Sequence, residues 1–153
     1  MSFYNIFSLI INKFNESKIK YALIGDISMG YWNVGRNTLD IDFLISLESL
    51  NDGKSIIDIL IAHRKYTNIM LSRAVKKKSQ DFEVKVLIPE DIIGLKLQAM
   101  VNDDSRKLQD MADIEMLIKR NTNIIDWNKI TEYFEIFDKI NELDYLRSNL
   151  VAK

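Results

Sequence analysis

The chain has 153 residues, of which 47% are hydrophobic and 28% are charged. This balance is that of a soluble globular domain, and it excludes a mostly disordered chain. The net charge of -1 excludes a general attraction to nucleic acid, although a local basic patch can still bind it. The absence of cysteine excludes disulfide bonds, thiolate metal sites and cysteine nucleophiles.

The N-terminal segment and the apolar runs indicate where the protein resides. Residues 1–5 have neither the basic start nor the small-residue cleavage site of a signal peptide. No apolar run approaches the roughly 18 residues that span a bilayer. We therefore expect a cytoplasmic protein that does not enter a membrane.

The first part of the chain mixes helix and strand signals. Apolar residues at helical spacing predict a helix over residues 2–16. The apolar run 21–24 ends at Gly25, as a buried strand does. A short helix is predicted over 27–32. Residues 38–45 then alternate apolar and polar side chains before becoming apolar throughout, which predicts a strand.

The middle of the chain is less regular. Residues 48–54 have the composition of a loop. Residues 56–61 predict a strand, and a helix that begins at Asn51 is the alternative, since periodicity does not separate short apolar runs. A helix is predicted over 66–74. The clean alternation of residues 82–87 predicts another strand.

Only helices are predicted in the last part of the chain, over residues 89–101, 104–119, 126–137 and 139–149. Pro89 suits the first turn of a helix, and the two acids that follow it suit the positive helix end. The order of elements predicts an α+β fold, with a small mixed β-sheet, flanking helices and a helical C-terminal part. We expect a single domain over 1–153, made of an α/β core over 1–88 and the helical part over 89–153.

Two carboxylates occupy neighbouring same-side positions of the predicted strand. Asp40 and Asp42 are two residues apart, so their Cα atoms would lie about 6.6 Å apart on one face. Carboxylate oxygens at this spacing can hold one divalent ion or bracket two, and Mg²⁺ prefers such ligands. A solvated strand edge is the alternative interpretation of the pair.

A candidate phosphate turn precedes this pair. Gly25, Asp26 and Ser28 follow a buried strand and open a short helix, whose backbone N–H groups can bind phosphate. Gly25 permits a close approach of the backbone. Arg36 and Thr38 come just before the acidic pair and can contact phosphate or base. A plain turn glycine and a surface arginine are the alternatives.

Together, residues 21–42 resemble the signature of the nucleotidyltransferase superfamily, in particular the branch of AbiE-type toxins of abortive-infection systems. Residues 36–42 match that branch's Arg-x-Thr-x-Asp-Ile-Asp element at every defined position. Downstream, residues 88–99 resemble the family's helix that carries a motif lysine, here Lys96. Residues 106–114 resemble its Arg-Lys-x-x-Asp-x-x-Asp element, and the resemblance spans roughly 20–118.

The resemblance implies a third metal-binding acid on a later strand. Asp58 is the position that matches it, with Glu83 as the fallback, and a helix-surface acid is the alternative interpretation of Asp58. Two features depart from the family pattern. Asp26 stands where the family has Gly or Ser, and the segment between Asp42 and Asp58 is short.

The implied activity is transfer of a nucleoside monophosphate from an NTP to a hydroxyl acceptor on RNA or tRNA, protein or a small molecule. The resemblance assigns Asp40, Asp42 and Asp58 to Mg²⁺ or Mn²⁺. The resemblance also implies phosphate or nucleotide binding by Gly25, Asp26, Ser28, Arg36 and Thr38. It implies that Lys96 and Arg106 neutralise charge on the phosphates. Asp110 and Asp113 would orient these cations or contact the acceptor.

Two other classes of function compete with this enzyme. One is a catalytically inactive relative that binds a nucleotide or a protein partner, which Asp26 and the short segment favour. The other is a helical interaction protein in which Asp-x-Asp has no role. An antitoxin-like partner and a homodimer are the expected protein contacts. The basic run of Arg73 and residues 76–78 is either a solvated face or a contact for an RNA backbone.

Overall fold

The computed structural model describes residues 2–46, 58–62 and 65–151, and for residues 58–62 and 151 it describes the backbone alone. The chain folds into two compact units. We call them the sheet unit, Met1–Tyr31 with Gly35–Ile88, and the helical unit, Trp32–Val34 with Pro89–Lys153.

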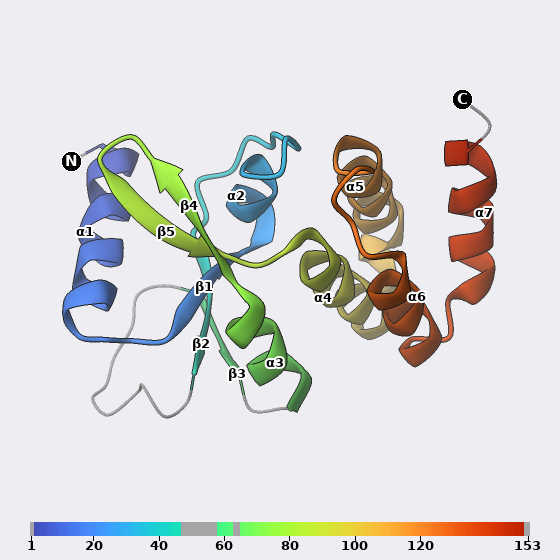
Figure 1. Ribbon diagram of the computed structural model, residues 1–153, viewed down its shortest axis with the longest axis horizontal. Coiled ribbons are helices and arrows are strands. Elements are labelled where there is room, and N and C mark those ends of the chain that lie inside the picture. Colours follow the sequence, from blue (N-terminus) through green and yellow to red (C-terminus); the bar gives the residue numbers. More distant parts are fainter. Residues whose placement is uncertain (1, 47–57, 63–64, 152–153) are drawn as a thin grey trace. The chain divides into compact units, whose positions relative to one another are not determined.

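The sheet unit contains a mixed sheet. Over the described residues, five strands form one sheet in the order β3-β2-β1-β5-β4 (Figure 1). Strand β1 is antiparallel to β2 and parallel to β5, and β2 is parallel to β3. This architecture confirms the predicted α+β fold class. In chain order the elements are α1 (Phe3–Glu16), β1 (Tyr21–Ile24), α2 (Gly25–Gly30), β2 (Asp42–Ser46), β3 (Asp58–Ala62), α3 (Lys65–Arg73), β4 (Val75–Ser79) and β5 (Phe82–Val86).

Aromatic side chains fill the space between α1 and the sheet. The rings of Phe14 and Phe43 meet edge to face with centroids 5.0 Å apart, and those of Phe7 and Phe82 are 5.4 Å apart. Such pairs contribute roughly 0.5–1.5 kcal/mol each beyond area burial. Because side chains alternate along a strand, Asp42 points away from the α1 side that Phe43 faces. Figure 1 shows α2 and α3 on that opposite side of the sheet.

The strand predicted over residues 38–45 is wrong in its first half, because β2 begins only at Asp42. The backbone N–H of Asp40 donates to the hydroxyl oxygen of Thr38 at 3.1 Å, a local turn that competes with strand pairing. Leu39, which the alternation placed inward, is 83% exposed. Asp40 and Asp42 therefore do not share one strand.

The described residues also test two other predictions. The helix predicted over 27–32 begins earlier, at Gly25, and ends at Gly30. The strand predicted over 56–61 is confirmed from Asp58 onward, whereas residues 56–57, the loop predicted over 48–54 and a helix start at Asn51 lie outside the described residues.

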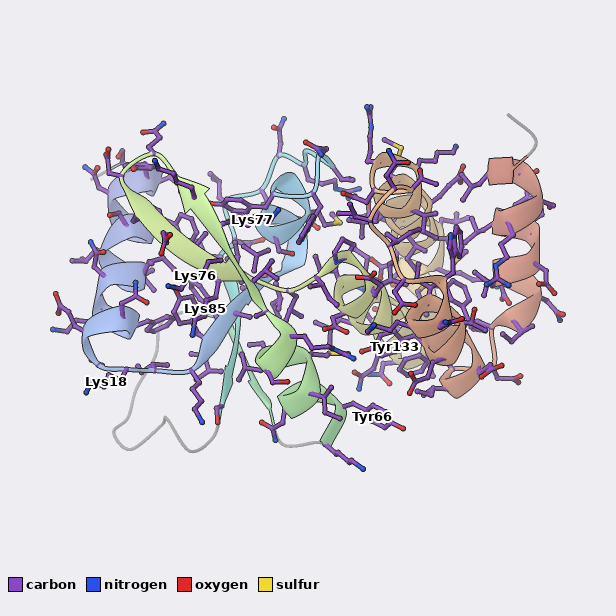
Figure 2. The ribbon with its side chains drawn as sticks, in the orientation of Figure 1. Lys18, Tyr66, Lys76, Lys77, Lys85 and Tyr133 are labelled. Atoms are coloured by element: carbon purple, nitrogen blue, oxygen red, sulfur yellow. The ribbon has the colours of Figure 1, made fainter. Side chains whose placement is uncertain are left out.

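Strand β4 was not predicted. Its sequence, Val-Lys-Lys-Lys-Ser, is rich in a residue type that strands disfavour. It forms because it pairs antiparallel with β5, which places Lys76 opposite Lys85 and Lys78 opposite Glu83. Figure 2 shows Lys76 and Lys85 on these neighbouring strands. As β4 is an edge strand, its lysines also discourage pairing with another chain.

The helical unit packs its helices around α4. Helix α4 contacts α5 and α6, and α6 contacts α7. The four predicted helices are confirmed to within two residues at their ends, with a short 3₁₀ turn opening the second. The elements are α4 (Pro89–Asn102), η2 (Asp104–Arg106), α5 (Lys107–Arg120), α6 (Trp127–Ile136) and α7 (Ile140–Val151).

Hydrogen bonds fix the start of α6. The Asp126 side chain accepts from the backbone N–H of Asn128 at 2.9 Å, and the Asp126 N–H donates to Glu90 at 2.6 Å. The hydrogen bond from Lys129 holds the pKa of the Asp126 carboxyl below its usual range. In the described part of the chain, no helix is long and apolar enough to cross a membrane.

Candidate functional site

The turn from β1 into α2 brings Gly25 against the first residue of β2. In the register of the sheet, Asp42 stands opposite Ile24, the residue before Gly25. A Cβ built on Gly25 would lie 2.1 Å from Oδ2 of Asp42, and the φ angle of Gly25 is 66°. Both the close approach and the left-handed backbone require glycine here. The Asp42 carboxylate therefore lies directly against the backbone of the predicted phosphate turn.

Asp40 lies outside the sheet. It is exposed, and its backbone is held by the Thr38 hydroxyl described above, whereas Asp42 is half-buried. The sequence placed both carboxylates on one strand face. The structure instead puts Asp40 in the segment that leads into β2 and Asp42 at the strand's first position.

The backbone of Asp58 lies beside that of Asp42. Strands β2 and β3 are parallel, and their first residues, Asp42 and Asp58, are register partners. The strand assignment of this segment is confirmed over the described residues, and the alternative of a helix-surface acid at Asp58 is wrong. Asp58 thus occupies the strand position next to Asp42.

A cation faces the acid in the turn. Nε of Arg36 lies 3.7 Å from Oδ2 of Asp26, and the two side chains are 29% and 30% exposed. In the sequence, Asp26 stands where the family has Gly or Ser, and Arg36 is a candidate ligand of phosphate or base. That these two groups pair with each other was missed, because Asp26 lies in α2 and Arg36 lies in the irregular segment that follows this helix.

Ser28 is buried, and its hydroxyl donates to the carbonyl of Gly25 at 2.6 Å. The hydroxyl thus stabilises the turn from inside. The resemblance implied nucleotide binding by Ser28, and in the structure its hydroxyl bonds within the turn itself.

Over the residues whose side chains are described, no group of three or more His, Asp or Glu residues could hold a metal ion. The predicted metal set has three members, and the side chain of Asp58 is not among those described. Of the three predicted metal ligands, the structure describes the side chains of Asp40 and Asp42.

The helical unit holds a buried charge cluster. Nζ of Lys96 on α4 donates to Oδ1 of Asp110 at 3.0 Å and to Oδ2 of Asp113 at 2.8 Å, both on α5. Lys96 is 8% exposed, and the two acids are 1% and 2% exposed. Lys96 is therefore a buried residue of α4 and not an exposed helix lysine. The prediction that these acids orient Lys96 agrees with the geometry, because residues three apart share a helix face.

Arg106 joins this cluster from its exposed end. Its Nε donates to Oδ2 of Asp110 at 3.0 Å, and its side chain is 52% exposed against 9% for Lys96. Asp110 thus accepts a hydrogen bond from Lys96 on one carboxylate oxygen and from Arg106 on the other. Two cations and two carboxylates make the cluster neutral in total, and Arg106 is its outward-facing charge.

Another buried acid supports α4. Asp91 is fully buried and accepts a hydrogen bond from the Tyr133 hydroxyl at 2.8 Å. A Cβ on Gly94 would lie 2.7 Å from the Tyr133 ring, so α4 and α6 meet at this glycine. Figure 2 shows Tyr133 within the helical unit. The polar contact of Tyr133 was missed because the sequence offers no signal for it.

Two comparisons with known proteins give a match. A family model described as nucleotidyl transferase AbiEii toxin, type IV TA system, matches residues 57–152. A crystal structure of an antigenic nucleotidyltransferase-like protein from Paracoccidioides brasiliensis is similar in fold, with a TM-score of 0.59 and 16% sequence identity, and the match covers 99% of this chain and 93% of that chain. A search of curated proteins finds no match.

The family match extends over more than half of the chain and includes the buried cluster of Lys96, Asp110 and Asp113. The turn at Gly25 and the acids Asp40 and Asp42 lie before the matched region. The candidate residues of the helical unit thus rest on the family match, and those of the sheet unit rest on the geometry of that unit.

Proposed function

The chain belongs to the family of nucleotidyl transferase AbiEii toxins of type IV toxin–antitoxin systems, and from this premise we propose that it transfers a nucleoside monophosphate from an NTP to a hydroxyl acceptor. The observation that carries the proposal is the Asp42 carboxylate against the Gly25 backbone, with Asp58 as the neighbouring strand position. In the reaction, the acceptor oxygen bonds to the α-phosphorus and the bond to the β-phosphate breaks. Pyrophosphate leaves, and the hydroxyl proton passes to a base.

The acids of the sheet unit fit Mg²⁺ or Mn²⁺ by their chemistry, because these ions take oxygen ligands from one or two carboxylates and from substrate phosphates. Asp40, Asp42 and Asp58 would hold the ions. Bound there, they would stabilise charge on the attacking and leaving oxygens. The close contact of Asp42 with Gly25 supports this fit, since it brings a ligand oxygen to the turn assigned to phosphate.

The remaining roles follow from exposure and hydrogen bonding. Thr38 holds the backbone of Asp40, and Ser28 holds the turn. Asp58 is the group that we assign to accept the hydroxyl proton.

The candidate cations differ in how far their side chains are buried. Lys96 already donates to two carboxylates and is buried, so we assign it to hold Asp110 and Asp113 in place. Arg36 in the sheet unit is more exposed, and we assign it to the phosphates. Arg106 in the helical unit is also exposed and stays a candidate phosphate ligand. Fixed cations of this kind lower the barrier, because positioning and electrostatics dominate phosphoryl transfer.

The proposed acceptors are hydroxyl groups of RNA or tRNA, of protein or of small molecules. The lysines of β4 support an RNA backbone as one contact. The family's membership of type IV toxin–antitoxin systems supports an antitoxin as a protein partner.

A catalytically inactive protein that binds a nucleotide or a protein partner is the second candidate function. The observation that favours it is Asp26, a carboxylate in the phosphate turn that is paired with Arg36. In this case nucleotide would bind without turnover.

Label transfer from α-³²P NTPs to total RNA or protein, with Mg²⁺ or Mn²⁺, tests the enzyme directly. We expect transfer by the wild-type chain and a loss of at least about 100-fold in Asp42→Asn, because that change removes a metal ligand. Transfer that survives Asp42→Asn would overturn the mechanism. Calorimetric binding of an NTP without transfer to any acceptor would favour the inactive protein.

A matched pair of variants tests the third acid. Asp58→Asn should abolish transfer, whereas Glu83→Gln should leave it unchanged, because Glu83 is an exposed residue that pairs with Lys76 on β4. The reverse result would assign the third metal ligand to Glu83.

A further inference from the structure

The ion pair between Asp26 and Arg36 suggests a control of affinity within the turn, and this inference rests on the proposed function. Asp26 directly follows Gly25, and Gly25 lies against the Asp42 carboxylate. The stretch of residues 25–42 contains three acids, Asp26, Asp40 and Asp42, against one cation, Arg36. This cation is therefore the positive charge that the stretch can offer to a phosphate.

The pair is loose. The 3.7 Å between Nε of Arg36 and Oδ2 of Asp26 exceeds hydrogen-bonding distance, and about 30% of each side chain is exposed. Pairs of this kind contribute little to stability, because solvent screens them. Arginine binds phosphate through two parallel charge-assisted hydrogen bonds, which are shorter and stronger. A phosphate at the turn can therefore displace the Asp26 carboxylate.

We propose that Asp26 is an affinity-determining residue, a carboxylate that competes with the triphosphate of the nucleotide for Arg36. When the ligand is absent, the Asp26 carboxylate lies beside the Arg36 guanidinium. When the ligand binds, its phosphate oxygens replace the Asp26 carboxylate on the guanidinium. The cost of that replacement lowers the affinity for every ligand of this class, inorganic tripolyphosphate included, and it acts only through Arg36.

Calorimetry with magnesium tripolyphosphate, at one fixed ionic strength, tests this competition. Asp26→Asn keeps the shape of the side chain and removes its charge, and we expect about fivefold tighter binding, the upper range for a partly exposed pair. Arg36→Met should weaken binding, and the gain from Asp26→Asn should shrink to within twofold when both changes are combined. Asp81→Asn removes the same charge from an exposed hairpin of the same unit and should change nothing.

Each other outcome overturns the inference in a recognisable way. Weaker or unchanged binding by Asp26→Asn would show that Asp26 positions Arg36 or has no effect on it. A gain that persists with Arg36→Met would show direct repulsion of the ligand. Absence of binding to every variant would overturn the phosphate site as well.

Label transfer from α-³²P NTPs separates this inference from the proposed function. Tighter tripolyphosphate binding by Asp26→Asn, with no transfer by any variant, would support the competition and overturn the enzyme. Transfer by the wild-type chain, without tighter binding by Asp26→Asn, would support the enzyme and overturn the competition.

Discussion

The two units of this chain each hold a cluster of opposite charges, and the clusters differ in burial. In the helical unit, Lys96 donates to Asp110 and Asp113 over 3.0 and 2.8 Å, and all three are nearly excluded from solvent. In the sheet unit, Arg36 faces Asp26 at 3.7 Å with about 30% of each side chain exposed. The first cluster is part of the architecture of its unit, because a buried charge that loses its partner is very unfavourable. The second can exchange partners at little cost.

The largest expected effect comes from breaking the buried cluster. Asp110→Asn leaves Lys96 with one carboxylate and removes the charged acceptor of the Arg106 Nε hydrogen bond. We expect the free energy of unfolding to fall by about 3–5 kcal/mol, as measured by urea denaturation.

Glu115→Ala is the control, because it removes an exposed acid that pairs with Lys119 on the same helix. It should cost less than about 0.5 kcal/mol. Equal effects of Asp110→Asn and Glu115→Ala would mean that burial does not distinguish the two kinds of pair.

A smaller effect is expected at Gly25, where the sheet unit has no room for an added methyl group. Gly25→Ala places a methyl group 2.1 Å from Oδ2 of Asp42 at a φ of 66°, so the backbone is strained and the carboxylate must move. We expect a loss of about 1–2 kcal/mol from the left-handed backbone alone, and loss of label transfer.

Gly30→Ala in the same helix is the matched control, because no atom lies within 4 Å of its added Cβ. This change should be neutral or stabilise the protein by up to about 1 kcal/mol. A Gly25→Ala variant with wild-type stability and transfer would show that the contact between the turn and Asp42 is not required.

Much of this fold follows from periodicity in the sequence. The alternation of residues 82–87 predicted β5, and Pro89 with the two acids that follow it predicted the start of α4. The alternation over 38–45 misled, because a hydrogen bond from the Asp40 N–H to Thr38 replaces strand pairing there. Strand β4 escaped prediction because its pairing with β5, and not its lysine-rich sequence, makes it a strand.

The candidate site was predictable only where its residues share an element. Asp110 and Asp113 are three apart on one helix, so a common face could be predicted, whereas the burial of Lys96 could not, since lysine is rarely buried. Asp26 and Arg36 are ten residues apart and belong to different local structures. Their pairing depends on how the segment after α2 folds back, which no periodic pattern encodes.

The smallest expected effect tests the loose pair itself. Arg36→Met keeps most of the apolar stem and removes the charge, so the free energy of unfolding should fall by less than about 1 kcal/mol. Unfolding in urea at low salt and in 1 M NaCl measures the screening. At 1 M salt the screening length is about 3 Å, so the difference between Arg36→Met and the wild type should vanish, whereas that of Asp110→Asn should persist. If the Arg36→Met difference persists at high salt, the pair with Asp26 is tighter than its geometry indicates, and Arg36 would then be as firmly held as Lys96. That result would remove the contrast between the two units, because an arginine held so firmly could not pass from a carboxylate to a phosphate.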